Sequence, residues 1–329
     1  MFSRKTAFAA LSLLIMAATV LAACAPTPTP APTPPPPEFT FYVVSHGGPA
    51  DPFWGVVMKG MEDAAAALNV KATYSGPEKF SIEELVNLLN SAIAAKPDGL
   101  AVTITDPKAL DEPLRRAIDQ GIPVIAINVA DPRPEGERIP YMFYIGMDEY
   151  LGGKQAAKRM LSVRTPKRAI CAIHEVGHVG LEARCKGFAE VMSEAGVPVE
   201  KLDIGTDPTA AVEVIKSYFA KNPDTDAIQT LGPLGAIPAI QFLKESGLAG
   251  KVLHGSFDID EVTLGGIKDG ITLFSIDQQQ YLQGYMAVVW LYLYNKYLLR
   301  PANDVLTGPG FVDSSNVARV EELIKAGYR

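Results

Sequence analysis

Residues 96–128 read KPDGLAVTITDPKALDEPLRRAIDQGIPVIAIN, and this stretch indicates the fold class of the whole chain. Two short runs rich in β-branched residues, 99–105 and 123–129, flank a stretch whose apolar residues recur with the period of a helix. Such a strand–helix–strand pattern is typical of parallel sheets covered by helices. We therefore expect an α/β protein.

The same alternation continues through most of the chain from Phe39 onward. We expect ten strands, over 39–45, 70–74, 99–105, 123–129, 143–146, 168–173, 201–205, 227–231, 251–257 and 271–276. Helices are expected between most of them, for example over 53–68, 81–95 and 281–299, and Ser81 with Glu84 forms a capping box at the start of the second. Five strands precede about Asp148 and five follow it, so we expect two doubly wound parallel-sheet lobes of ordinary domain size.

The first 38 residues differ in composition from the rest. Two basic residues precede the apolar run 7–23, which is shorter than the roughly 20 residues of a membrane-spanning helix, so residues 1–23 are expected to be a signal peptide. A transmembrane anchor is the alternative. The run closes as LAAC (21–24), which resembles the lipobox of bacterial lipoproteins and implies that Cys24 is lipidated. Residues 25–37, APTPTPAPTPPPP, complete a segment 24–38 that we expect to be a lipidated cysteine followed by an extended proline-rich stalk.

The other two cysteines, Cys171 and Cys185, lie fourteen residues apart in the expected folded part. The predicted export of the chain places them in oxidising surroundings, which favour a disulfide between them. Two buried thiols are the alternative. No pattern around either cysteine indicates catalysis or metal binding.

Charge and missing motifs exclude several functions. The 329 residues carry a net charge of −7 and therefore offer no basic field for a nucleic acid partner. The sequence contains none of the motifs G-x-G-x-x-G, G-x-x-x-x-G-K-[ST] and G-x-S-x-G. We expect no cofactor.

Polar and aromatic side chains follow the ends of the predicted strands, where ligands bind in open parallel sheets. Aromatic rings cover the apolar face of a sugar, while carboxylate, amide and guanidinium groups bind its hydroxyls. The candidate ligand-binding residues are Ser45, His46, Asp51, Phe53, Trp54, Asp106, Asn128, His174, Glu175, Arg184, Asp258 and Gln278, and His178 and Asp207 have similar positions. A mixed set without a cluster of Lys and Arg favours a small neutral sugar or polyol over a phosphorylated ligand, although the acidic excess of Asp51, Glu175 and Asp258 leaves room for an amino-substituted one.

Residues 174–178, HEVGH, match H-E-x-x-H, in which two histidines one helical turn apart bind zinc and the glutamate activates water. That mechanism requires a helix, but the match follows the strand-like run 169–173 and contains Gly177. We therefore expect a loop that faces the cleft and no metal. A zinc-dependent hydrolase using His174, Glu175 and His178 is the alternative function.

The segments VVSHGGPADPFW, KPDGLAVTITDP, GIPVIAIN, DEYLGGKQAA, ARCKGF, SFD and DQQQYLQGY, in this order, resemble the ribose-binding family of bacterial periplasmic binding proteins. The resemblance runs from about Phe39 to the C-terminus. It implies an ABC importer's substrate-binding subunit, whose two lobes close over a monosaccharide or polyol about a three-segment hinge. The implied lobes are 39–147 with 278–307, and 148–277 with 308–329.

The resemblance also implies roles for individual residues. Phe53 and Trp54 match the stacking aromatics, and the hydroxyl-binding residues are matched by Asp51, Asn128, Arg184, Asp258 and Gln278. Three features depart from the ribose binders: Val129 replaces an arginine, Leu231 replaces an asparagine, and His46, Gly47 and Gly48 lengthen the first loop. Ribose is therefore an improbable ligand, because a site built for hydroxyls rejects what leaves its polar groups unpaired.

From these observations we expect a monomeric, lipid-anchored extracytoplasmic receptor that performs no chemistry and delivers its ligand to an ABC permease in the membrane. A chemosensory sugar receptor would use the same site. A sugar-responsive transcription regulator is excluded, because the chain has no basic N-terminal helix-turn-helix.

Overall fold

The computed structural model describes residues 35–329. The expected signal peptide, Cys24 and most of the proline-rich segment lie outside the described residues. Within residues 35–329, no helix is both long enough and apolar enough to cross a bilayer. The description below concerns the compact unit Pro37–Arg329.

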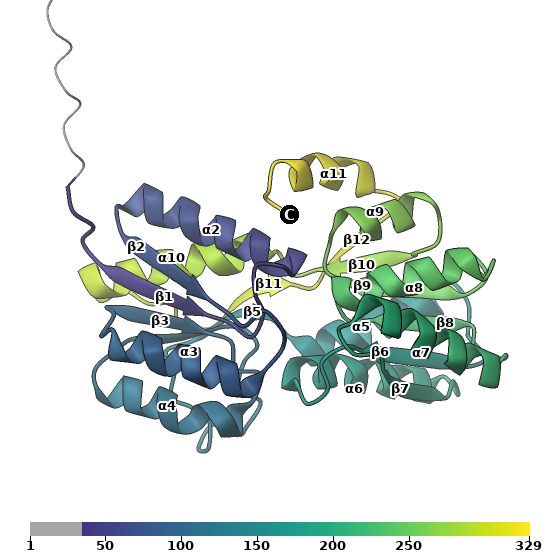
Figure 1. The fold of residues 1–329 in the computed structure, drawn as a ribbon, viewed down its shortest axis with the longest axis horizontal. Coiled ribbons are helices and arrows are strands. Elements are labelled where there is room, and N and C mark those ends of the chain that lie inside the picture. The colour runs from purple at the N-terminus through teal and green to yellow at the C-terminus, as the bar shows by residue number, and fades with distance from the viewer. Residues whose placement is uncertain (1–34) are drawn as a thin grey trace, which may run out of the picture. The chain divides into compact units, whose positions relative to one another are not determined.

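The first lobe is built on a six-stranded sheet of order β11-β5-β4-β3-β1-β2. Figure 1 shows this sheet between two pairs of helices. Its elements are β1 (Thr40–Val44), α2 (Pro52–Leu68), β2 (Lys71–Ser75), α3 (Ile82–Ala94), β3 (Gly99–Val102), α4 (Pro107–Asp119), β4 (Val124–Asn128), β5 (Tyr144–Met147), α10 (Gln280–Tyr297) and β11 (Val305–Gly308). All of its strand pairs are parallel.

The second lobe contains a six-stranded sheet of order β12-β10-β9-β8-β6-β7, in which only β12 runs antiparallel to its neighbour among the described strands. Its elements are α5 (Glu149–Leu161), β6 (Ala169–Ile173), α6 (Val179–Glu194), β7 (Val199–Asp203), α7 (Pro208–Lys221), β8 (Ala227–Thr230), α8 (Pro233–Glu245), β9 (Leu253–Phe257), α9 (Glu261–Lys268), β10 (Phe274–Asp277), β12 (Gly310–Asp313) and α11 (Val317–Lys325). The chain passes between the two sheets three times: after β5, after β10 and between β11 and β12.

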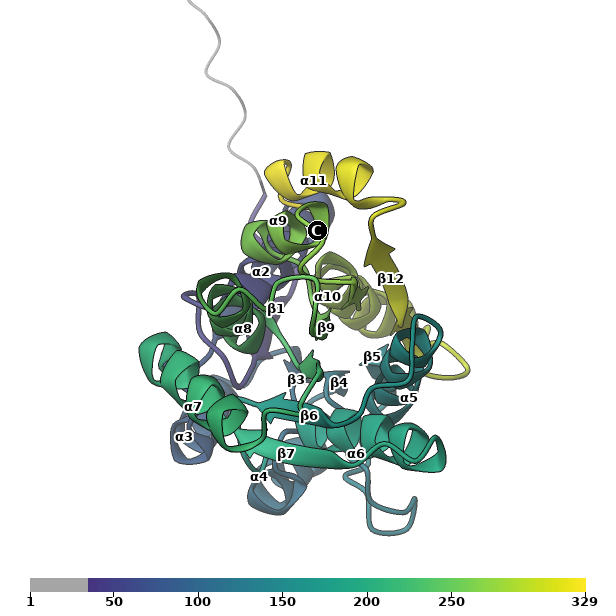
Figure 2. The same cartoon turned by 90° about the vertical axis from the view of Figure 1, so that its right-hand side faces the viewer.

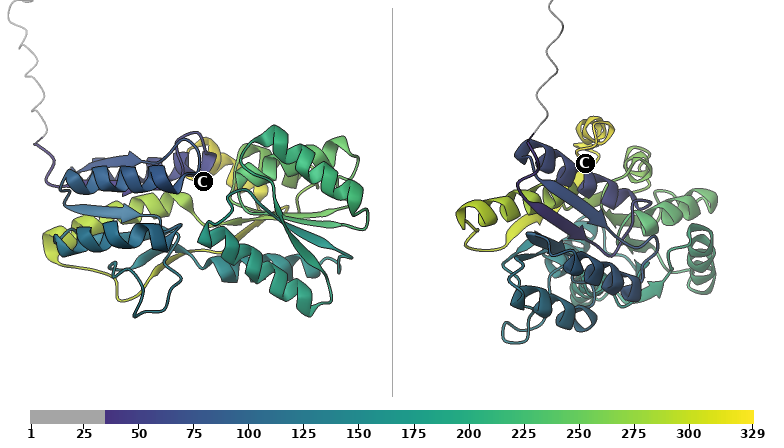
Figure 3. Two further views of the ribbon diagram at one scale, coloured as in Figure 1. Left: turned by 60° about the horizontal axis from the view of Figure 1, so that its bottom comes forward. Right: turned by 60° about the vertical axis from the view of Figure 1, so that its left-hand side comes forward.

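Both faces of each sheet are apolar because alternate residues of a strand point to opposite sides. In β1, Phe41 and Val43 pack against α2 and α10, whereas Val44 packs against α3 and α4. In the second lobe α5 and α6 cover one face, and α7 and α8 cover the other. Figures 2 and 3 show these helix pairs on the two sides of the second sheet. The predicted α/β class with two doubly wound lobes is confirmed.

Two details of the predicted elements are wrong. The strand expected over 201–205 lies at Val199–Asp203, because it is a largely exposed edge strand whose residues have no apolar pattern. The strands β11 and β12 were not expected, because four residues each, next to Gly308, Pro309 and Gly310, give too short a pattern. The predicted cap of α3 is present, since the Ser81 side chain accepts a hydrogen bond from the backbone N–H of Glu84.

Each lobe contains one helix pair that approaches closely at glycines. A Cβ atom at Gly60 in α2 would lie 2.1 Å from the carbonyl oxygen of Tyr281, and one at Gly284 in α10 would lie 2.0 Å from that of Val57. In the second lobe, a Cβ atom at Gly153 in α5 would lie 2.0 Å from the carbonyl oxygen of Arg184. These glycines are required because the two backbones touch there.

The substitution Gly60→Ala tests this close approach. Because the obstructing atom is backbone, the two helices must separate, and we expect the free energy of unfolding to fall by about 1–3 kcal/mol. Gly55→Ala in the same helix is the control: no atom lies within 4 Å of its Cβ position, so stability should rise by up to about 1 kcal/mol. Urea unfolding measures both, and equal effects would contradict the proposed contact.

Candidate functional site

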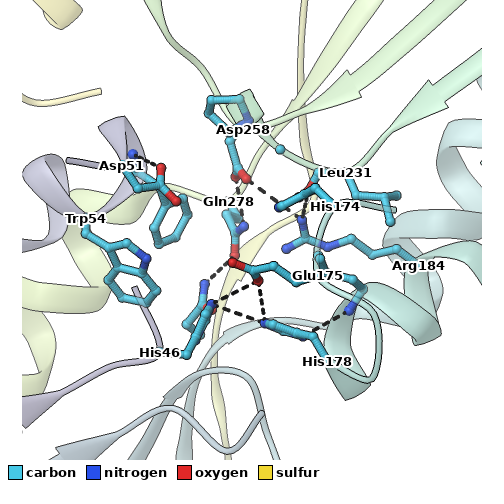
Figure 4. Close-up of a pocket in the computed structure, with 15 residues that line it drawn as sticks. His46, Asp51, Trp54, His174, Glu175, His178, Arg184, Leu231, Asp258 and Gln278 are labelled. Carbon is cyan, nitrogen blue, oxygen red and sulfur yellow. Dashed lines mark hydrogen bonds and ion pairs between the residues drawn. The ribbon is translucent and has the colours of Figure 1, made fainter. Parts of the chain in front are cut away.

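A polar cavity lies between the lobes, at the carboxyl ends of the strands of both sheets. Figure 4 shows the side chains that line it: His46, Asp51, Phe53, Trp54, Asn128, His174, Glu175, His178, Leu181, Arg184, Leu231, Gly232, Pro233, Asp258 and Gln278. The structure thus brings together ten of the twelve ligand-binding candidates from the sequence.

The aromatic side of the cavity is formed by the start of α2. Asp51 caps this helix, its carboxylate accepting the backbone N–H of Phe53 at 3.0 Å. The cap directs Phe53 and Trp54, which are 5% and 2% exposed, toward the cleft. The ring of His46 meets that of Trp54 edge-on at 5.0 Å between centroids. The first lobe therefore presents a fixed aromatic surface to a ligand.

The opposite side is dominated by the buried guanidinium of Arg184, in α6. Its Nε donates to the Glu149 carboxylate, and its Nη1 donates to the carbonyl oxygen of Leu231 at 2.6 Å. A carboxylate oxygen of Asp258 lies 3.8 Å from the same Nη1, and the guanidinium covers the Phe257 ring at 4.4 Å. Burial raises the pKa of Asp258 to about 7, although Arg184 opposes that rise. The charge and the hydrogen-bond donors of Arg184 thus have partners within its own lobe.

A disulfide lies next to Arg184. Cys171 of β6 and Cys185 of α6 are bonded, with their Cα atoms 5.7 Å apart. The bond ties the helix that carries Arg184 to β6, the strand next to the edge strand β7 of the second sheet. Together with the close approach of α5 at Gly153, it fixes the position of the guanidinium.

Amide side chains connect the two lobes where the chain crosses between them. Gln278 donates to the Asp258 carboxylate at 2.8 Å, and Asn128 donates to the Gln278 carbonyl oxygen at 3.3 Å. Asn128 and Asp258 both have left-handed backbone conformations, with φ of 61° and 65°. Such conformations are strained for residues other than glycine and cluster at functional sites.

The HEVGH segment does not form the helical zinc motif. His174 and Glu175 lie in the loop after β6, and His178 is the N-cap of α6, so the loop facing the cleft is as expected. Among residues 35–329, the three side chains close enough to share a metal ion are instead His46, Glu175 and His178. His178 Nδ1 accepts the backbone N–H groups of Gly180 and Leu181, at 3.1 and 3.2 Å.

These two acceptor contacts decide the chemistry of His178. A neutral imidazole whose Nδ1 accepts carries its proton on Nε2, which therefore donates to His46 Nε2 at 3.1 Å and offers no lone pair to a metal. A histidine that binds a metal through one nitrogen donates the N–H of the other to an acceptor. His178 does the reverse, because its Nδ1 accepts hydrogen bonds from two backbone N–H groups. The histidines form a hydrogen bond between the lobes and do not fit a metal ion.

Burial makes the histidines neutral and the carboxyl groups weakly acidic. It lowers the pKa values of His46 and His174 to about 3. It raises the pKa of Glu175 to about 8, helped by the negative charge of Asp51, and it raises the pKa of Asp51 to about 6.

Two candidates from the sequence lie outside the cavity lining. Asp106 caps α4, accepting the backbone N–H groups of Lys108 and Ala109. Ser45 is buried and donates to the Gly47 carbonyl oxygen at 2.8 Å, so it shapes the loop. The candidate list omitted Leu181, Leu231, Gly232 and Pro233, and the position of Gly232-Pro233 directly after a predicted strand was the available signal.

Residues 41–296 match the model of the family described as periplasmic binding protein domain. The chain belongs to this family. More narrowly, it is a type I periplasmic sugar-binding protein of the ribose-binding family, which confirms the resemblance found in the sequence. Membership implies an extracytoplasmic location.

Several relatives are sugar-binding proteins. The xylose/arabinose-binding protein XylF of Sulfolobus acidocaldarius is 30% identical over 81% of this chain and 69% of the relative. A carbohydrate transporter of Acidothermus cellulolyticus, solved with myo-inositol, is 34% identical with a TM-score of 0.81, over 89% of this chain and 100% of that one. An ABC sugar transporter of Legionella pneumophila is 31% identical with a TM-score of 0.77, over 82% and 100%. These relatives are transport proteins and not enzymes.

The pKa of Glu175 generates a pH-dependent prediction. Its folded pKa is raised from 4.5, so the stability this group contributes is present below pH 4.5 and is lost as the pH rises through about 8. Glu175→Gln removes the buried charge. We expect the stability of the variant relative to the natural protein to rise from pH 5 to pH 9, by on the order of 4 kcal/mol.

Urea unfolding at both pH values measures this gain. The control is Glu182→Gln, in the exposed pair with Lys201, whose effect should stay below about 1 kcal/mol at either pH. A Glu175→Gln effect that is independent of pH would contradict the raised pKa.

Proposed function

We propose that this protein is the substrate-binding lipoprotein of an ABC importer, anchored through Cys24, which captures a monosaccharide or sugar alcohol between its two lobes. One observation carries the proposal: a buried cavity has aromatic rings on the side of one lobe and an Arg184–Asp258 polar surface on the other. The ligand would contact both lobes and thereby join them.

The chemistry of the lining suits a ring with an apolar face and polar edges. Trp54 offers a flat apolar surface, and Asp258, Gln278 and Asn128 offer donors and acceptors around it. Each sugar hydroxyl both donates and accepts a hydrogen bond. Neighbouring amide and carboxylate groups can therefore pair with it and leave no donor or acceptor unsatisfied. The relatives named for xylose and arabinose, or solved with myo-inositol, support a ligand of this size and class.

Contacts between the lobes away from the crossings support a closing motion. The backbone N–H of Val179 donates to the Thr105 carbonyl oxygen at 3.1 Å, and His178 donates to His46. Each of these hydrogen bonds contributes only a modest free energy. A ligand that contacts both lobes would shift the population toward the closed form by its differential affinity. The anchored receptor would then present its closed form to the permease.

The two tryptophans of the chain allow a test of sugar binding at this cavity. Trp54 lines it, whereas Trp290 lies in α10 beside Phe143. In Trp290→Phe, Trp54 is the only fluorophore of its kind, so titration with pentoses, hexoses and inositols should change its emission. The natural protein should gain thermal stability with the same compounds, by about 2.7 kcal/mol at 100 times the dissociation constant.

Trp54→Ala should weaken binding roughly 10-fold or more, because the stacking surface is lost. Trp290→Phe should bind as the natural protein does, and it serves as the matched control. If no sugar or polyol changed either the emission or the melting temperature, the proposal would fail.

A further inference from the structure

More carboxyl groups than cations surround the cavity. Asp51, Glu175 and Asp258 line it, Asp51 being half-buried and the other two buried, and the buried Glu149 lies behind the lining next to Arg184. Arg184 is the cation among the described residues that surround the cavity. Its guanidinium is engaged by Glu149, by a backbone carbonyl and by Asp258. Asp51 and Glu175 are therefore left without a cationic partner in the described part of the chain.

Glu175 is 7% exposed and points into the cavity, as Figure 4 shows. Within residues 35–329 its carboxylate accepts no hydrogen bond, and it lies 3.9 Å from His178 Nε2 and 4.0 Å from His46 Nε2. Those two nitrogens share a hydrogen bond with each other, and both imidazole rings are neutral. A buried carboxylate with no donor is costly, so this group points to a donor supplied by a ligand.

His174, the residue before Glu175, is also unpartnered. It is 8% exposed, and its buried Nδ1 has no hydrogen-bond partner among the described residues. As a neutral imidazole it has one acceptor and one donor nitrogen. Two adjacent side chains of the same loop thus lack partners beside the cavity.

Asp51 faces Glu175 from the other lobe. Burial is the main cause of the raised pKa of Glu175, and the negative charge of Asp51 adds to it. One oxygen of Asp51 caps α2. We call the side chains of Asp51 and Glu175 the carboxylate pair.

The carboxylate pair also lines a second pocket, which opens between the lobes. Its other charged residues are Glu78, Asp207 and Lys79. Four carboxyl groups against one ammonium give the opening a negative potential. Such a potential raises the local concentration of cations and repels anions.

We propose that the ligand is an amine-bearing sugar or cyclitol, a cation at neutral pH, whose ammonium group binds between Asp51 and Glu175. The inference rests on the proposed function and names the substrate class of the same site. It departs from the neutral ligand that the sequence favours. The raised pKa leaves Glu175 largely protonated at neutral pH in the absence of a cation. An ammonium donates three hydrogens and carries the charge that lets both carboxyl groups ionise, whereas a hydroxyl donates one hydrogen and carries no charge.

Calorimetry with matched compounds at pH 7 tests the proposal. The pairs are D-glucosamine and D-glucose, D-galactosamine and D-galactose, and 1-amino-1-deoxy-scyllo-inositol and scyllo-inositol. We expect the amine of at least one pair to bind roughly 10-fold or more tightly than its hydroxyl counterpart, because only the amine neutralises the pair.

Two variants locate the effect. Glu175→Gln and Asp51→Asn should each reduce the ratio of amine to hydroxyl affinity about 5-fold or more. Each substitution removes one ionisable carboxyl group and replaces it with an amide of the same shape. Asparagine also caps helices well, so Asp51→Asn should retain the fold. Glu182→Gln removes a charge on α6 outside the cavity lining and should leave the ratio unchanged.

The outcomes separate this inference from the proposed function. If hydroxyl compounds bind and their amines bind equally or more weakly in every pair, the inference is overturned and the proposed function stands. If an amine is preferred but both variants keep the ratio, the assignment to the carboxylate pair is overturned. If no compound of either kind binds, both fail.

Discussion

The burial of Arg184 is the constraint on which the site depends. A guanidinium can leave water only where its donors and its charge are matched, and here Glu149, the Leu231 carbonyl and Asp258 do so from three separate elements of one lobe. Those elements must therefore be placed before any ligand arrives. The disulfide of Cys185 with the sheet supplies part of that placement. The binding surface of the second lobe is therefore preorganised, and a bound ligand would bring the first lobe against it.

Much of the fold and part of the site could be predicted from sequence because they rest on local patterns. The strand–helix alternation gave the two sheets, and residues that follow strands, such as Trp54 and Asp258, do reach the cavity. The same rule also included Asp106, whose carboxylate is taken up by the start of its own helix. Position after a strand does not distinguish a helix cap from a ligand contact, because both use the same residue types.

The remaining features depend on contacts between distant segments, which no local pattern records. The bond between His46 and His178 joins residues 132 positions apart, and the Leu231 carbonyl acts through its backbone, so the side chain gives no signal. The H-E-x-x-H match is misleading for the same reason. Its second histidine caps a helix instead of lying on one, and the hydrogen bonds that it accepts determine which nitrogen carries the proton.

The glycine contacts have a mechanical consequence. Where α2 meets α10, and where α5 meets α6, main chain lies against main chain with no side chain between them to change rotamer. Each lobe should then move as a rigid body. Any opening of the cleft must be absorbed by backbone rotations at the three crossings, among them the residues next to Gln278 and Gly308. Substitutions there would change how readily the empty receptor opens while leaving the ligand's own contacts intact.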